Sequence, residues 1–130
     1  MAVPSVPTFS VAAKAAANTE LLALLDAGSA GGSIRLRDSS DVLLAEVPLS
    51  SPGGTVNETT GALELSIAGP DASADAGGTV AYAELCDYDG DVHLALPAKQ
   101  GTEAEVGYLV LNNLAVLQGG TVTITSATIG

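Results

Sequence analysis

The segment of residues 79–96 has two apolar runs separated by the turn sequence Tyr88-Asp89-Gly90-Asp91. Asp-Gly between such runs is the strongest short-range signal for a β-hairpin, because a two-residue type I′ turn needs positive φ at both central positions. The predicted cross-strand pairs are Leu85 with Leu94, Ala83 with Leu96, and Asp87 with Val92. A shift of one residue would mix the apolar and polar faces, so the turn and the pattern predict the same register. The hairpin therefore indicates a fold built mainly from β-strands.

The first nine residues predict an extended N-terminal arm. Residues 1–9 contain Pro4 and Pro7, which exclude a helix and favour polyproline-like geometry. The apolar residues of this arm, which lack a local partner and need a surface to cover them, are Val3, Val6 and Phe9.

Residues 10–27 predict a single Ala-rich helix. Ser10 can cap its start, and Gly28 can end it. Asn18 and Thr19 could divide the helix into two shorter pieces. The apolar residues that share one stripe at helical spacing are Val11, Ala15, Leu22 and Leu25.

The rest of the chain predicts strands, separated by turns rich in Gly and Pro. The predicted strands are residues 33–37, 42–47, 62–68, the two strands of the hairpin, 106–111 and 121–129. Residues 106–111 are apolar on both faces, which predicts a strand covered on both sides. Seven strands at this spacing are typical of a sandwich or a barrel, and we predict an antiparallel β-sandwich. Residues 10–130, including the helix, would form one domain.

The charge of the chain excludes several classes of partner. Fifteen acidic and four basic residues give a net charge of −11. Proteins that bind nucleic acids need clustered Lys and Arg, so we predict no nucleic-acid partner and no anionic membrane partner. Cys86 is the single cysteine, which excludes a disulfide within the chain and is compatible with folding in a reducing cytosol. The N-terminus lacks a signal-peptide pattern, and no apolar run is long enough to span a bilayer.

Two groups of side chains near the hairpin turn could carry chemistry. Asp87, Asp89 and Asp91 could hold a hard cation, although Gly90 comes too early for a calcium loop and Ala98 stands where a Glu ligand would be expected. A plain turn is the favoured interpretation. Cys86 and His93 lie opposite each other in the predicted register and would be the skeleton of a thiol nucleophile. A surface histidine is the simpler interpretation, because catalysis also needs a cleft and an orienting group.

Two arginines share one face of a predicted strand. Arg35 and Arg37 lie in residues 33–37, and Glu46 lies on the facing strand of the same predicted hairpin. They could pair with Glu46 within the chain or form ion pairs with a partner subunit. The sequence leaves both interpretations open.

The order of these segments resembles that of a known family. The segments that carry the likeness are residues 24–28 (LLDAG), 33–38 (SIRLRD), 43–47 (LLAEV), 73–79 (SADAGGT), the hairpin turn, 108–112 (YLVLN) and 119–124 (GGTVTI). Together they resemble small proteins encoded beside the major capsid protein of tailed bacteriophages, some of which are capsid decoration or cement proteins.

The resemblance implies a structural virion protein made in the host cytoplasm and bound to the outer capsid surface, with the major capsid protein as its partner. It implies no catalytic residues, and we predict no enzymatic activity, cofactor or metal. Because the binding sites on a shell have closed symmetry, we expect a homotrimer at three-fold positions, although a dimer also satisfies the symmetry rules. The predicted contact residues are Val3, Pro4, Val6, Pro7, Phe9, Arg35 and Arg37.

Two other functions compete with this one. A phage tail or adhesion module that binds host surface carbohydrate could use Tyr82 and Tyr88, which share a face in the predicted register. An enzyme using Cys86 and His93 is the third hypothesis.

Overall fold

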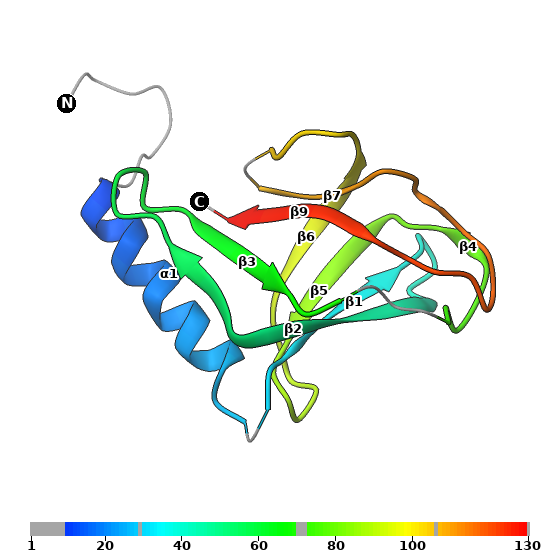
Figure 1. Cartoon of the computed structure of the whole chain (residues 1–130), viewed down its shortest axis with the longest axis horizontal. Coiled ribbons are helices and arrows are strands. Elements are labelled where there is room, and N and C mark those ends of the chain that lie inside the picture. Colours follow the sequence, from blue (N-terminus) through cyan, green and yellow to red (C-terminus); the bar gives the residue numbers. More distant parts are fainter. Residues whose placement is uncertain (1–9, 29, 70–72, 106, 130) are drawn as a thin grey trace.

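The computed structural model describes residues 10–28, 30–69, 73–105 and 107–129, and it shows one helix beside a β-barrel (Figure 1). The predicted arm, residues 1–9, lies outside the described residues. The elements are α1 (Val11–Leu25), β1 (Ser33–Arg37), β2 (Leu43–Val56), β3 (Leu63–Ile67), β4 (Gly78–Thr79), β5 (Tyr82–Cys86), β6 (Val92–Gln100), β7 (Tyr108–Leu111), β8 (Ala115–Val116) and β9 (Ile124–Ile129).

Seven of the strands form a closed barrel, so the prediction of an antiparallel sandwich is wrong in its architecture. The order around the ring is β1-β2-β3-β9-β7-β6-β5, and β5 closes the ring against β1. An odd number of strands cannot alternate in direction all the way round a ring, so one neighbouring pair must run parallel. That pair is β6 and β7, where Ala98 lies beside Leu109. The short strands β4 and β8 form a separate two-stranded sheet.

The hairpin of β5 and β6 has the predicted register over most of its length. Leu85 pairs with Leu94 and Ala83 pairs with Leu96, as predicted. A register shift after Leu85 then places Cys86 opposite Val92. The bulge therefore changes the cross-strand neighbours close to the turn.

The hairpin turn itself is not the predicted type I′ turn. The Gly90 N–H donates to the Asp87 carbonyl at 3.1 Å, and Gly90 has φ of 91° while Asp89 is not in the positive-φ region. This is a three-residue loop in which a turn is followed by a left-handed glycine. One Asp87 side-chain oxygen also accepts the Asp91 N–H at 3.0 Å, which favours the longer loop. Asp-Gly suits both loops, so the dipeptide alone could not distinguish them.

Strand β2 is longer than predicted. It continues through Pro48 and Pro52 to Val56, although the prolines and glycines of this stretch predict a loop after residue 47. The pairing with β3 shifts register between Leu49 and Gly54. Pro52 lies within this irregularity, where no ladder hydrogen bond is needed from it.

The barrel interior is filled by aliphatic side chains. The buried core cluster includes Ile34, Leu36, Leu44, Val47, Leu85, Leu96, Leu109 and Leu111 from the barrel strands, and Leu25 of α1 belongs to the same cluster. Strand β7 is buried on both faces, as predicted for residues 106–111, although the strand begins at Tyr108. The barrel is therefore a scaffold with a packed aliphatic core.

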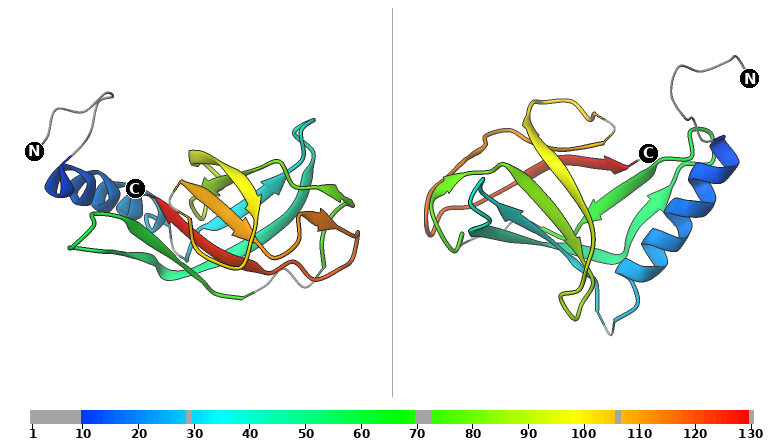
Figure 2. Two further views of the ribbon diagram at one scale, coloured as in Figure 1. Left: turned by 90° about the horizontal axis from the view of Figure 1, so that it is seen from above. Right: turned by 180° about the vertical axis from the view of Figure 1, so that it is seen from behind.

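Helix α1 lies outside the barrel, beside β2 and β3 (Figures 1 and 2). Ser10 caps it as predicted, with its hydroxyl oxygen accepting the Ala13 N–H at 3.1 Å. The helix ends at Leu25 with Asp26 as its cap, two residues before Gly28.

Asn18 does not interrupt the helix but attaches it to the barrel. Its side chain is 6% exposed, and its amide nitrogen donates to the carbonyls of Gly61 at 2.7 Å and Ile129 at 3.3 Å. Val11, which the helical stripe predicts to be buried, is 43% exposed. The inner face of the helix is therefore centred on Asn18 and Leu25.

Candidate interaction surfaces

The two arginines of β1 form ion pairs on the outer wall of the barrel. Arg35 pairs with Glu46 within the chain, one of the two interpretations that the sequence leaves open, at 2.8 Å between Nε and the carboxylate. Arg37 pairs instead with Glu84 on β5, because β1 lies between β2 and β5 in the ring. Each hydrogen bond raises the pKa of its arginine. Partly exposed pairs of this kind contribute roughly 0–1 kcal/mol each, so they fix side-chain positions more than they stabilise the fold.

Cys86 and His93 do not lie opposite each other as the predicted register required, because Cys86 pairs with Val92. Cys86 is fully buried, and burial raises the pKa of its thiol. His93 instead contacts Asp87, at 2.9 Å between Nε2 and the carboxylate, and this hydrogen bond lowers the pKa of Asp87. A buried thiol without a neighbouring base is a poor nucleophile.

The three aspartates of the turn do not converge on one point. Asp87 is occupied by His93 and by the Asp91 N–H, while the Asp89 and Asp91 side chains are exposed. Within the described ranges, no three His, Cys, Asp or Glu side chains are placed to hold a metal ion together.

The tyrosines of the hairpin lie at opposite ends of β5. The Tyr82 hydroxyl donates to Asp41 at 2.7 Å, which raises the pKa of Tyr82 to about 12. Tyr88 is 55% exposed at the turn and packs over Gly28, where an added Cβ would lie 2.3 Å from the Tyr88 Cβ. Six strand residues span about 20 Å, so the two rings do not form one binding platform.

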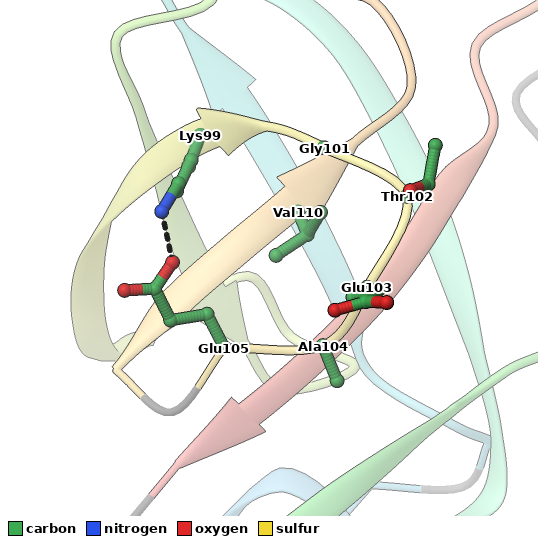
Figure 3. A pocket seen from close by; sticks show the side chains of 7 residues that line it. All are labelled: Lys99, Gly101, Thr102, Glu103, Ala104, Glu105 and Val110. Carbon is green, nitrogen blue, oxygen red and sulfur yellow. Dashed lines mark hydrogen bonds and ion pairs between the residues drawn. The ribbon is translucent and has the colours of Figure 1, made fainter.

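The segment after β6 folds back over β7 and leaves a hollow of about 340 Å³ (Figure 3). Figure 3 shows Lys99 reaching toward Glu105, with which it forms an ion pair. The Lys99 ammonium also lies 5.5 Å from the centre of the Tyr108 ring. The hollow thus has one cation, already paired with Glu105, and a second carboxylate, Glu103, in its lining around the buried Val110.

The outward surface of α1 is nearly free of charge. We call this surface the outer face of α1; its exposed residues are Ala12, Ala13, Ala16, Ala17, Thr19, Glu20, Ala23 and Leu24. The Thr19 hydroxyl donates to the Ala15 carbonyl at 2.7 Å, so Thr19 has its donor satisfied within the helix. The sequence argument identifies only the inner stripe. The signal for the outer face is that α1 has just two charged residues, Lys14 and Glu20.

Comparisons of the chain with protein-family models, with curated proteins and with solved structures give no match. No helix within the described ranges has the length and apolar character needed to cross a membrane.

Proposed function

We propose that this protein is a structural virion protein that decorates and stabilises the outer capsid shell of a tailed phage by binding the major capsid protein. The proposal rests on the resemblance in the order of segments. The structural observation that supports it most is that the side chains that could carry chemistry are buried or paired within the chain. Cys86 is buried, His93 is bound to Asp87, and both arginines of β1 are paired within the chain.

The charge distribution suits a protein on the outside of a DNA-filled shell. Three of the four basic side chains pair with glutamates of the same chain, which leaves a large excess of acidic groups at the surface. Such a surface keeps the protein soluble in the host cytoplasm and repels packaged DNA.

The contact residues remain a proposal. Val3, Pro4, Val6, Pro7 and Phe9 lie outside the described residues. We propose that they bind the shell or a neighbouring copy, and that copies associate as a homotrimer at shell sites. Deleting residues 1–9 should weaken capsid binding or trimerisation while the domain still folds, because every described element begins at or after Val11. Unchanged binding after the deletion would remove the arm from the mechanism.

The alternative role as a carbohydrate-binding tail module has less support, because Tyr82 and Tyr88 do not share a platform. The copy number of the protein in purified virions, measured by quantitative mass spectrometry against the major capsid protein, distinguishes the two roles. A ratio near that of the shell subunit is expected for decoration. A few copies per particle would favour the tail role, and absence from virions would overturn both.

A further inference from the structure

Lys14 differs from the other basic residues of the chain. Arg35, Arg37 and Lys99 each form an ion pair with a glutamate of the same chain. Lys14 lies half-buried in the first turn of α1, and among the described residues no group forms an ion pair or a hydrogen bond with its ammonium group. Charges that lose part of their hydration are normally paired. In a chain with fifteen acidic residues, an unpaired Lys14 therefore indicates a group that is available to a ligand.

Lys14 lines a cavity of about 360 Å³ between α1, the turn that joins β2 to β3, and the outer wall of the barrel. We call it the Lys14 cavity; its other lining residues are Asn57, Thr60, Ala62, Glu64, Ala104 and Thr128. Figure 1 shows the β2–β3 turn against the first half of α1.

The walls of the Lys14 cavity are held by specific contacts. The register of β3 and β9 places Glu64 beside Thr128. Gly61 in the turn has φ of 78°, and an added Cβ there would lie 2.7 Å from the Lys14 Cβ, so only glycine allows the turn to approach the helix this closely. The side chain of Asn18 joins the same helix to the Gly61 carbonyl at 2.7 Å. The cavity is therefore part of the way the helix packs on the barrel.

The β2–β3 turn offers hydrogen-bond donors to the cavity. The side-chain oxygen of Asn57 accepts the N–H groups of Thr59 at 2.9 Å and Thr60 at 3.2 Å, which leaves the amide N–H groups of Asn57 to donate. The hydroxyl oxygen of Thr60 accepts the Ala62 N–H at 3.3 Å, so the hydroxyl proton of Thr60 is also available. Together with the Lys14 ammonium, these donors suit a carboxylate.

Glu64 adds a negative charge to the same cavity. Its side chain forms no ion pair with Lys14, although both residues line the cavity. A carboxylate in the lining disfavours ligands with two or more negative charges, such as phosphate. One cation and one anion are balanced by a ligand that carries both charges, and the cavity volume is near the lower end for small-molecule sites.

We propose that the Lys14 cavity binds a small zwitterion of the amino-acid class, whose carboxylate pairs with Lys14 and whose ammonium group pairs with Glu64. This inference is independent of the proposed function, because it concerns a small ligand and not the capsid shell.

The test is a titration of the ¹⁵N-labelled full chain followed by NMR. The probes are glycine, β-alanine, 4-aminobutyrate and 6-aminohexanoate, which place the two charges at increasing separations. Butyrate and butylammonium, each with one of the charges, are the controls. We expect saturable shifts of the amide signals of Gly61, Ala62 and Thr128 below about 20 mM with at least one zwitterion, and binding at least about fivefold weaker for each control.

Variants of the two charged residues assign the site. Lys14→Met keeps a long side chain without the charge and should weaken zwitterion binding by about fivefold or more, while Lys14→Arg should restore it to within about twofold of wild type. Glu64→Gln should abolish the preference for the zwitterion over butyrate. Glu20→Gln makes the same change on α1 outside the lining and should keep that preference. All four variants should unfold at nearly the wild-type temperature.

The inference fails if no probe gives saturable shifts, since the cavity would then hold only water. It also fails if butyrate binds the wild-type chain as tightly as the best zwitterion, or if Lys14→Met binds that zwitterion like wild type. None of these results bears on decoration, which is judged by the copy number in virions.

Discussion

Replacing Asn18 by Ala tests how α1 is held on the barrel. The amide of Asn18 donates to the Gly61 carbonyl, which is buried, and to the Ile129 carbonyl, which is partly buried. Gly61 has φ of 78°, and an added Cβ there would lie 2.7 Å from the Lys14 Cβ, so the helix and this turn are in close contact. The site is too tight for a larger side chain, and Ala removes the donor without adding volume.

The expected loss of stability can be worked out from these contacts. A buried carbonyl left without its donor costs about 1–3 kcal/mol, and the longer, less buried bond adds roughly 0.5 kcal/mol. The higher helix propensity of Ala offsets about 0.5 kcal/mol of this loss in stability. The free energy of unfolding of Asn18→Ala should therefore fall by about 2 kcal/mol, which in a domain of this size lowers Tm by roughly 6–10 °C.

The assay is urea unfolding followed by far-ultraviolet circular dichroism, because the chain contains no Trp. Thr19→Ala is the matched control: it lies next to Asn18, gains the same kind of helix propensity, and loses only a bond within the helix. It should unfold within about 0.5 kcal/mol of wild type. If Asn18→Ala and Thr19→Ala have the same urea midpoint, the amide does not hold the helix and the reasoning is refuted.

Asn18→Asp sharpens the same test. At neutral pH it would place a carboxylate against two carbonyl oxygens, so it should be less stable than Asn18→Ala. Protonation at acid pH restores one donor, so the difference between Asp and Ala at this position should shrink as the pH falls. A pH-independent difference would contradict a donor role for Asn18.

Three further predictions concern the hairpin and its surroundings. Gly32→Ala should lower the free energy of unfolding by about 2 kcal/mol or more, because its Cβ would lie 2.1 Å from the Cys86 carbonyl oxygen; Gly69→Ala, with nothing within 4 Å, should stay within about 1 kcal/mol of wild type. Because folding lowers the pKa of Asp87, the stabilisation that its carboxylate gives the fold is complete above about pH 4. This stabilisation is lost as the pH falls through the folded-state pKa. The urea midpoint of Asp87→Asn should therefore lie below wild type at pH 7 and approach it in acid, and a constant gap would exclude the bond to His93 as the cause. Cys86 should react with a thiol reagent at pH 8 at least about 100-fold more slowly in the native protein than in urea, and rapid native labelling would show that the thiol is accessible.

The sequence predicts local elements well because their signals are local. The cap at Ser10, the length of α1 and the pairing of Leu85 with Leu94 all depend on residues within one element or one turn. The same reasoning fails where one extra residue enters a strand. The bulge after Leu85 moves Cys86 away from His93, and no residue in that segment indicates that a bulge is present.

Asn18 shows a different limit of sequence reasoning. A polar residue in the middle of an Ala-rich helix suggests an interruption, because Asn competes for backbone hydrogen bonds. Its role depends on carbonyls at Gly61 and Ile129, which are distant in the sequence and meet only in the folded chain. The helical spacing of Asn18 and Leu25 on one face is the signal that could have placed it against the barrel.

Closure of the barrel also bears on the proposed binding to a capsid shell. An arm could bind a neighbouring copy by adding a strand to a sheet edge, as an open sandwich would allow. In the seven-stranded ring each strand has a neighbour on both sides, so the barrel gives no complete edge to such a strand. The β4–β8 sheet has free edges, but its strands have two residues each and can form only a few hydrogen bonds. Packing of side chains is then the more effective route for the proposed association, because it needs no free strand edge.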